Sequence, residues 1–168
     1  MDEQHNGHDD RPLPGTTNVE QAVATLGAFL EQDGWHPQRT DEASAYRVFY
    51  QGDSGDIRCS ATVNSANQEF FFYAYASIRV PEELRSAAAE YLARANYGLR
   101  IGNFELSFAD GTVRYKSSLD FTDAALTPAL ISNAIYPAVY ILDEYLPGLL
   151  KVIYGNAQPA DAIAEIES

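Results

Sequence analysis

The fold is most visible in the segment YGLRIGNFEL, residues 97–106, which is followed by Asp110-Gly111 and then by Tyr115. Gly98 is typical of a helix end. The residues after it change to the alternation of apolar and polar side chains that marks a half-buried strand. Asp110-Gly111 favours a tight hairpin turn because glycine tolerates a positive φ. The segment therefore predicts a helix end, a short link, a strand, a turn and a returning strand that carries Tyr115.

The composition indicates one folded domain of ordinary size. The chain has 168 residues, of which 46% are hydrophobic and 12% aromatic, so a sizeable core can form. Its 24 acidic and 11 basic side chains give a net charge of −13. This charge opposes contact with phosphate groups, so we expect neither nucleic acid nor an anionic membrane as partner. The charge is compatible with a basic peptide or protein as partner, and also with a role in solubility alone.

The chain has the features of a cytoplasmic protein. Cys59 is the single cysteine, so no intramolecular disulfide can form and a reducing compartment fits. The polar, acidic start shows no secretory signal. Residues 124–142 are uncharged and long enough to cross a bilayer. However, they contain two prolines and polar side chains, and acids flank them, so we expect a buried helix instead.

Hydrophobic periodicity along the chain predicts an α+β fold with a twisted antiparallel sheet of about five strands and three helices, in the order α-βββ-α-ββ-α. Residues 1–16 are expected to be a disordered leader, 17–155 a single domain and 156–168 an acidic flexible tail. Pro137 and Pro147 should kink or break the last helix. Helices are expected at about 18–33, 81–97 and 128–154, and strands at about 45–51, 57–63, 70–78, 104–108 and 113–121.

The strand that begins at Phe70 is apolar on both faces. One face carries Phe70, Phe72 and Ala74, and the other carries Phe71, Tyr73 and Tyr75. Such a strand is normally central, with material packed on both sides. The alternative is that Phe71, Tyr73 and Tyr75 form a binding or dimer surface. The apolar last helix offers a second such surface at Tyr136 and Tyr140.

No catalytic or metal-binding pattern stands out. The histidines are His5, His8 and His36, and none lies in a motif that pairs it with a nucleophile or with further ligands. Gly52 and Gly55 lie in a hairpin with no helix after them to bind phosphate. We therefore expect no enzyme, no metal and no cofactor.

The chain resembles the YbjN family of bacterial sensory transduction regulators over about residues 18–155. The resemblance rests on Asn96-Tyr97, on Gly102 to Glu105, on the Asp110-Gly111 turn and on Ile153-Tyr154-Gly155 at the end of the last helix. It implies a fold like that of type III secretion chaperones, which are small acidic proteins, often dimeric, that bind extended segments of client proteins. It implies no catalytic residues.

These observations favour a non-enzymatic, chaperone-like or regulatory protein that acts by binding another protein, and we expect it to be a homodimer. The candidate protein-binding or dimer surface consists of Phe71, Tyr73, Tyr75, Tyr136 and Tyr140. The alternative is a small-molecule sensor, because tyrosines combine polar tips with an apolar lining. Its expected pocket is lined by Tyr46, Tyr50, Tyr73 and Tyr115.

Overall fold

The computed structural model describes residues 17–42 and 44–168, and the predicted leader lies outside them. Six antiparallel strands form one sheet in the order β1-β2-β3-β4-β6-β5. The elements are α1 (Asn18–Gln32), β1 (Gln38–Arg39), β2 (Ala45–Gly52), β3 (Gly55–Asn64), β4 (Glu69–Arg79), the 3-10 turn η1 (Glu82–Leu84), α2 (Arg85–Gly98), β5 (Asn103–Leu106), β6 (Thr112–Asp120), α3 (Pro128–Tyr154) and α4 (Pro159–Ile166). The α+β class and the antiparallel sheet are confirmed. The described chain exceeds the predicted five strands and three helices by β1 and α4.

The extra strand β1 is too short for the sequence to reveal. It has two residues, which pair with Tyr46 and Arg47 of β2. Alternation needs about four residues to be visible, so a pair of residues after Trp35 reads only as an extended connection. The strand exists because the chain comes back alongside β2.

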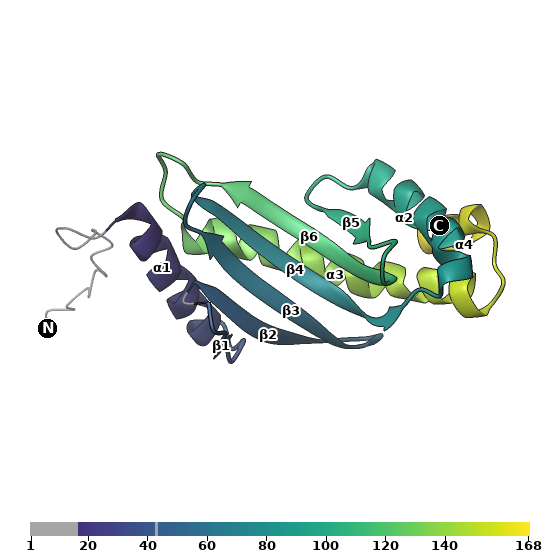
Figure 1. Ribbon diagram of the computed structural model, residues 1–168, viewed down its shortest axis with the longest axis horizontal. Helices are drawn as coiled ribbons and strands as arrows, with labels where there is room; N and C mark the ends of the chain where they lie inside the picture. The colour runs from purple at the N-terminus through teal and green to yellow at the C-terminus, as the bar shows by residue number, and fades with distance from the viewer. Residues whose placement is uncertain (1–16, 43) are drawn as a thin grey trace, which may run out of the picture.

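The helices lie on one face of the sheet, with α3 running behind its central strands (Figure 1). The side chains that β3 and β4 turn toward the helices are buried, and they alternate with more exposed ones. They are Ile57, Cys59, Ala61 and Val63 of β3 and Phe70, Phe72 and Ala74 of β4. The core therefore lies between the sheet and the helices, and the opposite face of the sheet, called the open face below, has no helix on it among the described residues.

The apolar character of α3 on all sides is explained within one copy of the chain. The helix contacts β4 and β6 on one side, and α1, α2 and α4 pack around the rest of it. It runs unbroken through Pro137 and Pro147, where the sequence predicted a kink or a break. Ala138 and Leu146, which follow and precede these prolines, are buried. Their packing compensates for the missing hydrogen bonds.

The end of the chain forms a packed helix where the sequence predicted a flexible acidic tail over residues 156–168. In α4, Pro159, Ala162 and Ile163 are buried against α2 and α3. The Tyr145 hydroxyl donates a hydrogen bond to the Glu167 carboxylate at 3.0 Å. The acidic residues face outward, and the apolar ones recur at helical spacing and meet a surface that α2 and α3 form together.

The segment 97–106 folds as predicted, and the residues in and around it have structural roles. The amide group of Asn96 bridges Phe104 of β5: its oxygen accepts from the Phe104 N–H at 2.7 Å and its nitrogen donates to the Phe104 carbonyl at 3.1 Å. Gly102 has a φ of +77°, and a Cβ there would lie 2.5 Å from the Lys116 carbonyl oxygen. The Tyr115 hydroxyl donates to the Ile101 carbonyl. These bonds fix the link between α2 and β5.

Candidate protein-binding surface

Three aromatic side chains of β4 follow one another along the middle of the open face. Phe71, Tyr73 and Tyr75 are half-buried, while the alternate residues of the strand are buried on the helical side. The rings of Phe71 and Tyr73 are 6.1 Å apart and parallel within 2°, and those of Tyr73 and Tyr75 are 6.3 Å apart. They form a continuous apolar row that only neighbouring strands flank.

Two arginines of the flanking strands lie over these rings. In the sheet register, Tyr75 stands between Arg58 of β3 and Arg114 of β6. The Arg58 guanidinium is 4.7 Å from the ring centre of Tyr75, and that of Arg114 is 4.1 Å from the ring centre of Tyr73. Such cation–π contacts hold the guanidinium groups against the aromatic rings, and the N–H groups of Arg114 still reach a carboxylate.

Glu105 of β5 forms ion pairs with two bases of the same face. Its carboxylate lies 2.7 Å from Arg114 and 2.7 Å from Lys116. Burial raises the pKa of Glu105, but hydrogen bonds from Lys116 and Arg114 outweigh burial and leave the pKa below 4.5. The carboxylate is therefore charged at neutral pH and neutralises part of the positive charge around it.

We define the aromatic–basic face by the aromatic row and the charged side chains in the two cross-strand rows through Tyr73 and Tyr75. Its members are Phe71, Tyr73, Tyr75, Arg47, Arg58, Arg114, Lys116 and Glu105. It carries four of the 11 basic side chains of the protein and one of its 24 acidic side chains. An acidic protein thus presents a locally positive surface.

Three hollows surround the aromatic row on the open face. One of 410 Å³ lies beside Phe71 and Tyr73, and one of 270 Å³ lies beside Tyr75 and Arg58. The latter adjoins the stretch after Tyr75 where the register of β4 with β6 is irregular. A third, of 710 Å³, lies over the β5–β6 hairpin at Arg114. All three are open depressions, which suits a protein segment better than an enclosed small molecule.

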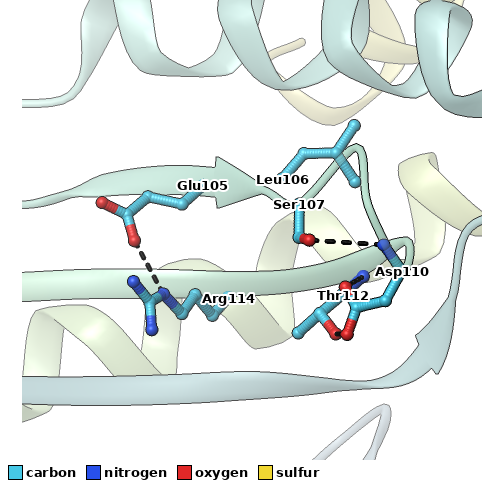
Figure 2. A pocket seen from close by; sticks show the side chains of 6 residues that line it. All are labelled: Glu105, Leu106, Ser107, Asp110, Thr112 and Arg114. Atoms are coloured by element: carbon cyan, nitrogen blue, oxygen red, sulfur yellow. Dashed lines mark hydrogen bonds and ion pairs between the residues drawn. The ribbon is translucent and has the colours of Figure 1, made fainter.

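The charged side chains of the third hollow are engaged with one another or with the hairpin turn. Figure 2 shows its side chains, with Glu105 and Arg114 paired across the two strands. Hydrogen bonds from Ser107 and Thr112 lower the pKa of Asp110 to about 2. Because these bonds also close the hairpin turn, the carboxylate of Asp110 serves the turn and is a poor proton acceptor.

The other predicted surface residues, Tyr136 and Tyr140, lie away from the open face. They are on α3 beside the edge of the helical layer, where Tyr140 packs against Tyr50 of β2 with ring centres 5.9 Å apart. The Tyr136 hydroxyl donates to Asp33 at 2.5 Å, and this bond raises the pKa of Tyr136 to about 12. The structure therefore divides the five predicted residues between two surfaces, with Phe71, Tyr73 and Tyr75 together on one.

The tyrosine pocket expected for a small-molecule sensor does not form as predicted. Tyr46 and Tyr115 are buried in the core, and Tyr73 is on the opposite face of the sheet from Tyr50. The type of a residue in a strand does not show which residues of other strands share its face. A separate hollow of 550 Å³ lies beside Tyr50 and Tyr140.

The sequence reasoning missed the basic members of the face. Arg47 and Arg58 are exposed and alternate with buried side chains of β2 and β3. Their grouping with Arg114 and Lys116 depends on β6 lying next to β4, although α2 and β5 separate the two strands in the chain. Strand alternation predicts the side of a residue, but it does not predict the neighbouring strand.

Neither a metal-ligand cluster nor a membrane-spanning helix is found in the part of the chain that the structure describes. No group of three histidine, cysteine or carboxylate side chains is placed to hold a metal ion there. Within the same residues, no helix combines the length and the apolar character needed to cross a bilayer.

Comparison with known families identifies the chain. A family model described as "YbjN: Putative bacterial sensory transduction regulator" matches residues 22–151. The chain belongs to the YbjN family. The crystal structure described as "YbjN, a putative transcription regulator from E. coli" is similar, with 16% sequence identity and a TM-score of 0.51 over 79% of this chain and 89% of that one. This YbjN structure supports the fold, and a comparison with curated proteins found no match.

The YbjN resemblance seen in the sequence is thereby confirmed, and most of the residues that carried it have structural roles. Asn96 bridges β5, Gly102 permits the close approach of the link to β6, and Glu105 pairs with two bases. Tyr97 and Tyr154 are exceptions, since 96% and 69% of their surfaces are exposed. The motif therefore reports the YbjN fold more than an activity.

Proposed function

We propose that the protein is a non-enzymatic cytoplasmic regulator that acts by binding another protein, in a chaperone-like manner, through the aromatic–basic face. The observation that carries the proposal is the row of Phe71, Tyr73 and Tyr75 without a helix above it, in a sheet whose other face is fully packed. Contiguous aromatic surface of this kind is typical of interaction sites. The regulatory description of the YbjN family agrees with this role.

The occupant of the face in this proposal is a partner protein or a second copy of the chain, since we also expect a homodimer. The rest of the apolar surface supports this choice of site. The large apolar side chains of α3 are mostly buried within one copy, so the helix no longer requires a partner. The open face then presents a continuous aromatic row that no helix covers among the described residues.

A Tyr73→Asp variant tests the proposal. It places a charge in the middle of the aromatic row, where it should abolish partner binding and self-association while leaving the helix and sheet content unchanged in circular dichroism. Tyr97→Asp is the matched control, because Tyr97 is an exposed tyrosine of α2 outside the face. The measurements are co-purification from native cells and sedimentation velocity. The proposal fails if Tyr73→Asp behaves like the wild type, or if the wild type neither retains a partner nor self-associates.

A small-molecule sensor remains the second candidate, and the hollow beside Tyr50 and Tyr140 favours it. Asp53 and Asp143 line the same hollow, but both oxygens of the Asp143 carboxylate already accept from the backbone of residues 53 and 54. A thermal-shift screen with metabolites distinguishes the two functions. A ligand that stabilises the wild type but not a Tyr140→Ala variant would favour the sensor.

A further inference from the structure

The charge of the aromatic–basic face defines its partner more closely. We infer that this face binds an extended segment of a partner protein in which acidic side chains accompany apolar ones. The inference rests on the proposed function, and it adds the chemistry of the partner. An acidic partner differs from the basic peptide or protein that the net charge of the whole chain leaves open.

Charge complementarity favours an acidic segment. Arg47 and Arg58 have no carboxylate partner among the described residues, although acids outnumber bases by more than two to one in the chain. Arg114 and Lys116 share the single carboxylate of Glu105. The two rows through Tyr73 and Tyr75 therefore hold four bases and one acid, while Asp56 and Glu42 line the hollows beside them. Carboxylates of a partner would complete the ion pairs of Arg47 and Arg58.

The geometry of the aromatic row suits an extended segment. Arg58 and Arg114 lie on the two sides of Tyr75, in one cross-strand row. The guanidinium groups of Arg58 and Arg114 lie against the tyrosine rings. An apolar side chain of a partner placed between the two arginines would contact the aromatic rings, and acidic side chains next to it would reach the guanidinium nitrogens. An extended segment alternates its side chains in this way. Across five strands spaced about 4.8 Å apart, roughly six extended residues span the face.

The edge of the sheet at β5 offers little room for strand addition. The Asn96 amide occupies both backbone groups of Phe104 on the outer edge of β5. Pairing of a partner strand needs a row of free backbone groups. At the other edge, β1 pairs only with Tyr46 and Arg47 of β2. A segment that contacts the aromatic row in the middle of the sheet lies on the face and is held there by side chains.

Two other occupants fit less well. The proposed function allows a second copy on this face, and the charges decide between the two occupants: a second copy placed face to face would oppose four bases with four bases, which is unfavourable. A nucleic acid strand would stack on the aromatic row, but beyond Phe71 it would meet Glu69 and Asp120, which stand opposite each other in the sheet. A strand with a phosphate at every nucleotide cannot avoid them, whereas a peptide can carry its acids only where the bases lie.

The test uses the full-length protein and three labelled peptides of twelve residues. In the first, Glu alternates with Leu; in the second and third, Gln and Lys replace Glu. A single-stranded dT12 oligonucleotide is the fourth probe. Fluorescence anisotropy should give a Kd at least tenfold lower for the Glu peptide than for the Gln peptide, with no binding of the Lys peptide. Because salt screens interactions between charges, the affinity for the Glu peptide should fall as the salt concentration rises from 0.05 to 0.5 M.

Substitutions in the face connect the binding to its residues. An Arg47→Gln/Arg58→Gln double variant should raise the Kd of the Glu peptide at least tenfold and change the Kd of the Gln peptide by less than twofold. Arg94→Gln is the matched control, because Arg94 pairs with Glu90 on the surface of α2. The control should bind every peptide as the wild type does.

Other outcomes overturn the inference in distinguishable ways. If the Glu and Gln peptides bind equally and neither binds to Tyr73→Asp, the inference of an acidic partner is refuted, while protein binding by the face is supported. If dT12 binds more tightly than the Glu peptide, the ligand of the face is a nucleic acid and the inference is refuted. Absence of binding by every probe refutes the inference, while co-purification with the Tyr73→Asp variant still tests the proposed function by itself.

Discussion

Replacing Gly102 with alanine should destabilise the protein through two effects that the structure separates. The residue has a φ of +77°, a conformation that costs an alanine about 1–2 kcal/mol. Alanine also restricts the unfolded chain, which offsets about 0.4–1 kcal/mol of this cost. The strain alone should therefore lower the free energy of unfolding by about 1 kcal/mol.

The second effect is a collision. The Cβ that Gly102→Ala introduces would lie 2.5 Å from the Lys116 carbonyl oxygen and 2.5 Å from the Tyr115 ring, where contacts of 3.4 Å or more are ordinary. The carbonyl belongs to β6, which pairs with β4 and β5 and cannot move freely. Overpacking of this kind costs about 1–3 kcal/mol. The total for Gly102→Ala is then about 2–4 kcal/mol, or a fall in Tm of roughly 5–15 °C for a domain of this size.

Gly34→Ala is the control that isolates the strain. Gly34 has a nearly identical φ of +79°, but beyond its own chain neighbours no atom lies within 4 Å of the position that a methyl group would take. Urea unfolding followed by circular dichroism should show a loss of about 1 kcal/mol for Gly34→Ala and about 2–4 kcal/mol for Gly102→Ala. Equal losses in the two variants would refute the collision and, with it, the close approach of the link to β6.

Three further predictions concern single buried or paired groups. The Ser117 hydroxyl is buried without a hydrogen-bond partner among the described residues, so Ser117→Ala should raise the free energy of unfolding by about 1 kcal/mol; a loss in urea unfolding would contradict this. Glu105→Gln should lower it by about 1 kcal/mol or less at pH 7. Because the folded pKa of Glu105 is below 4.5, this difference should disappear as the pH falls through that folded pKa, and a constant difference would count against the ion pairs. Burial raises the pKa of the Cys59 thiol to about 12, so it should react with a thiol reagent at pH 8 roughly a thousandfold more slowly than in urea; comparable rates would show that the thiol is accessible.

Much of the fold was predictable because local signals and tertiary packing agree. Thr17 and Glu20 have the spacing of a capping box, and both of its hydrogen bonds form at the start of α1. Thr127 caps α3, and Pro128 begins it. The alternation of β3 and β4 predicted which side chains are buried. In each case one local pattern is sufficient, because the side chains involved are near one another in the chain.

The failures occur where distant segments decide the outcome. The stripe of Pro159, Ala162 and Ile163 was hidden by surrounding acids, and α4 is stable only because α2 and α3 form a surface for it. A helix of eight residues is too short to persist in isolation. The unbroken course of α3 through its prolines has the same cause, because its packing against the sheet outweighs the local preference.

The candidate surface divides in the same way. The sequence identified Phe71, Tyr73 and Tyr75 as one face of a strand with two apolar sides, and the structure places them together. It did not identify what lies beside them. Tyr136 and Tyr140, which the sequence offered as a second surface, lie on α3 away from the open face. Which strand neighbours β4 depends on long-range pairing, so the basic members of the face could not be predicted from alternation.

Residue spacing and composition were enough to predict the class of fold, the positions of most helices and strands, and the apolar row of β4. These properties depend on interactions between residues a few positions apart, which the order of amino acids records directly. The folded chain was needed to show that one side of the sheet has no helix on it among the described residues, and that four bases gather around the aromatic row. Those features arise because β4 pairs with β6 across the intervening α2 and β5, and because the helices pack on one face alone.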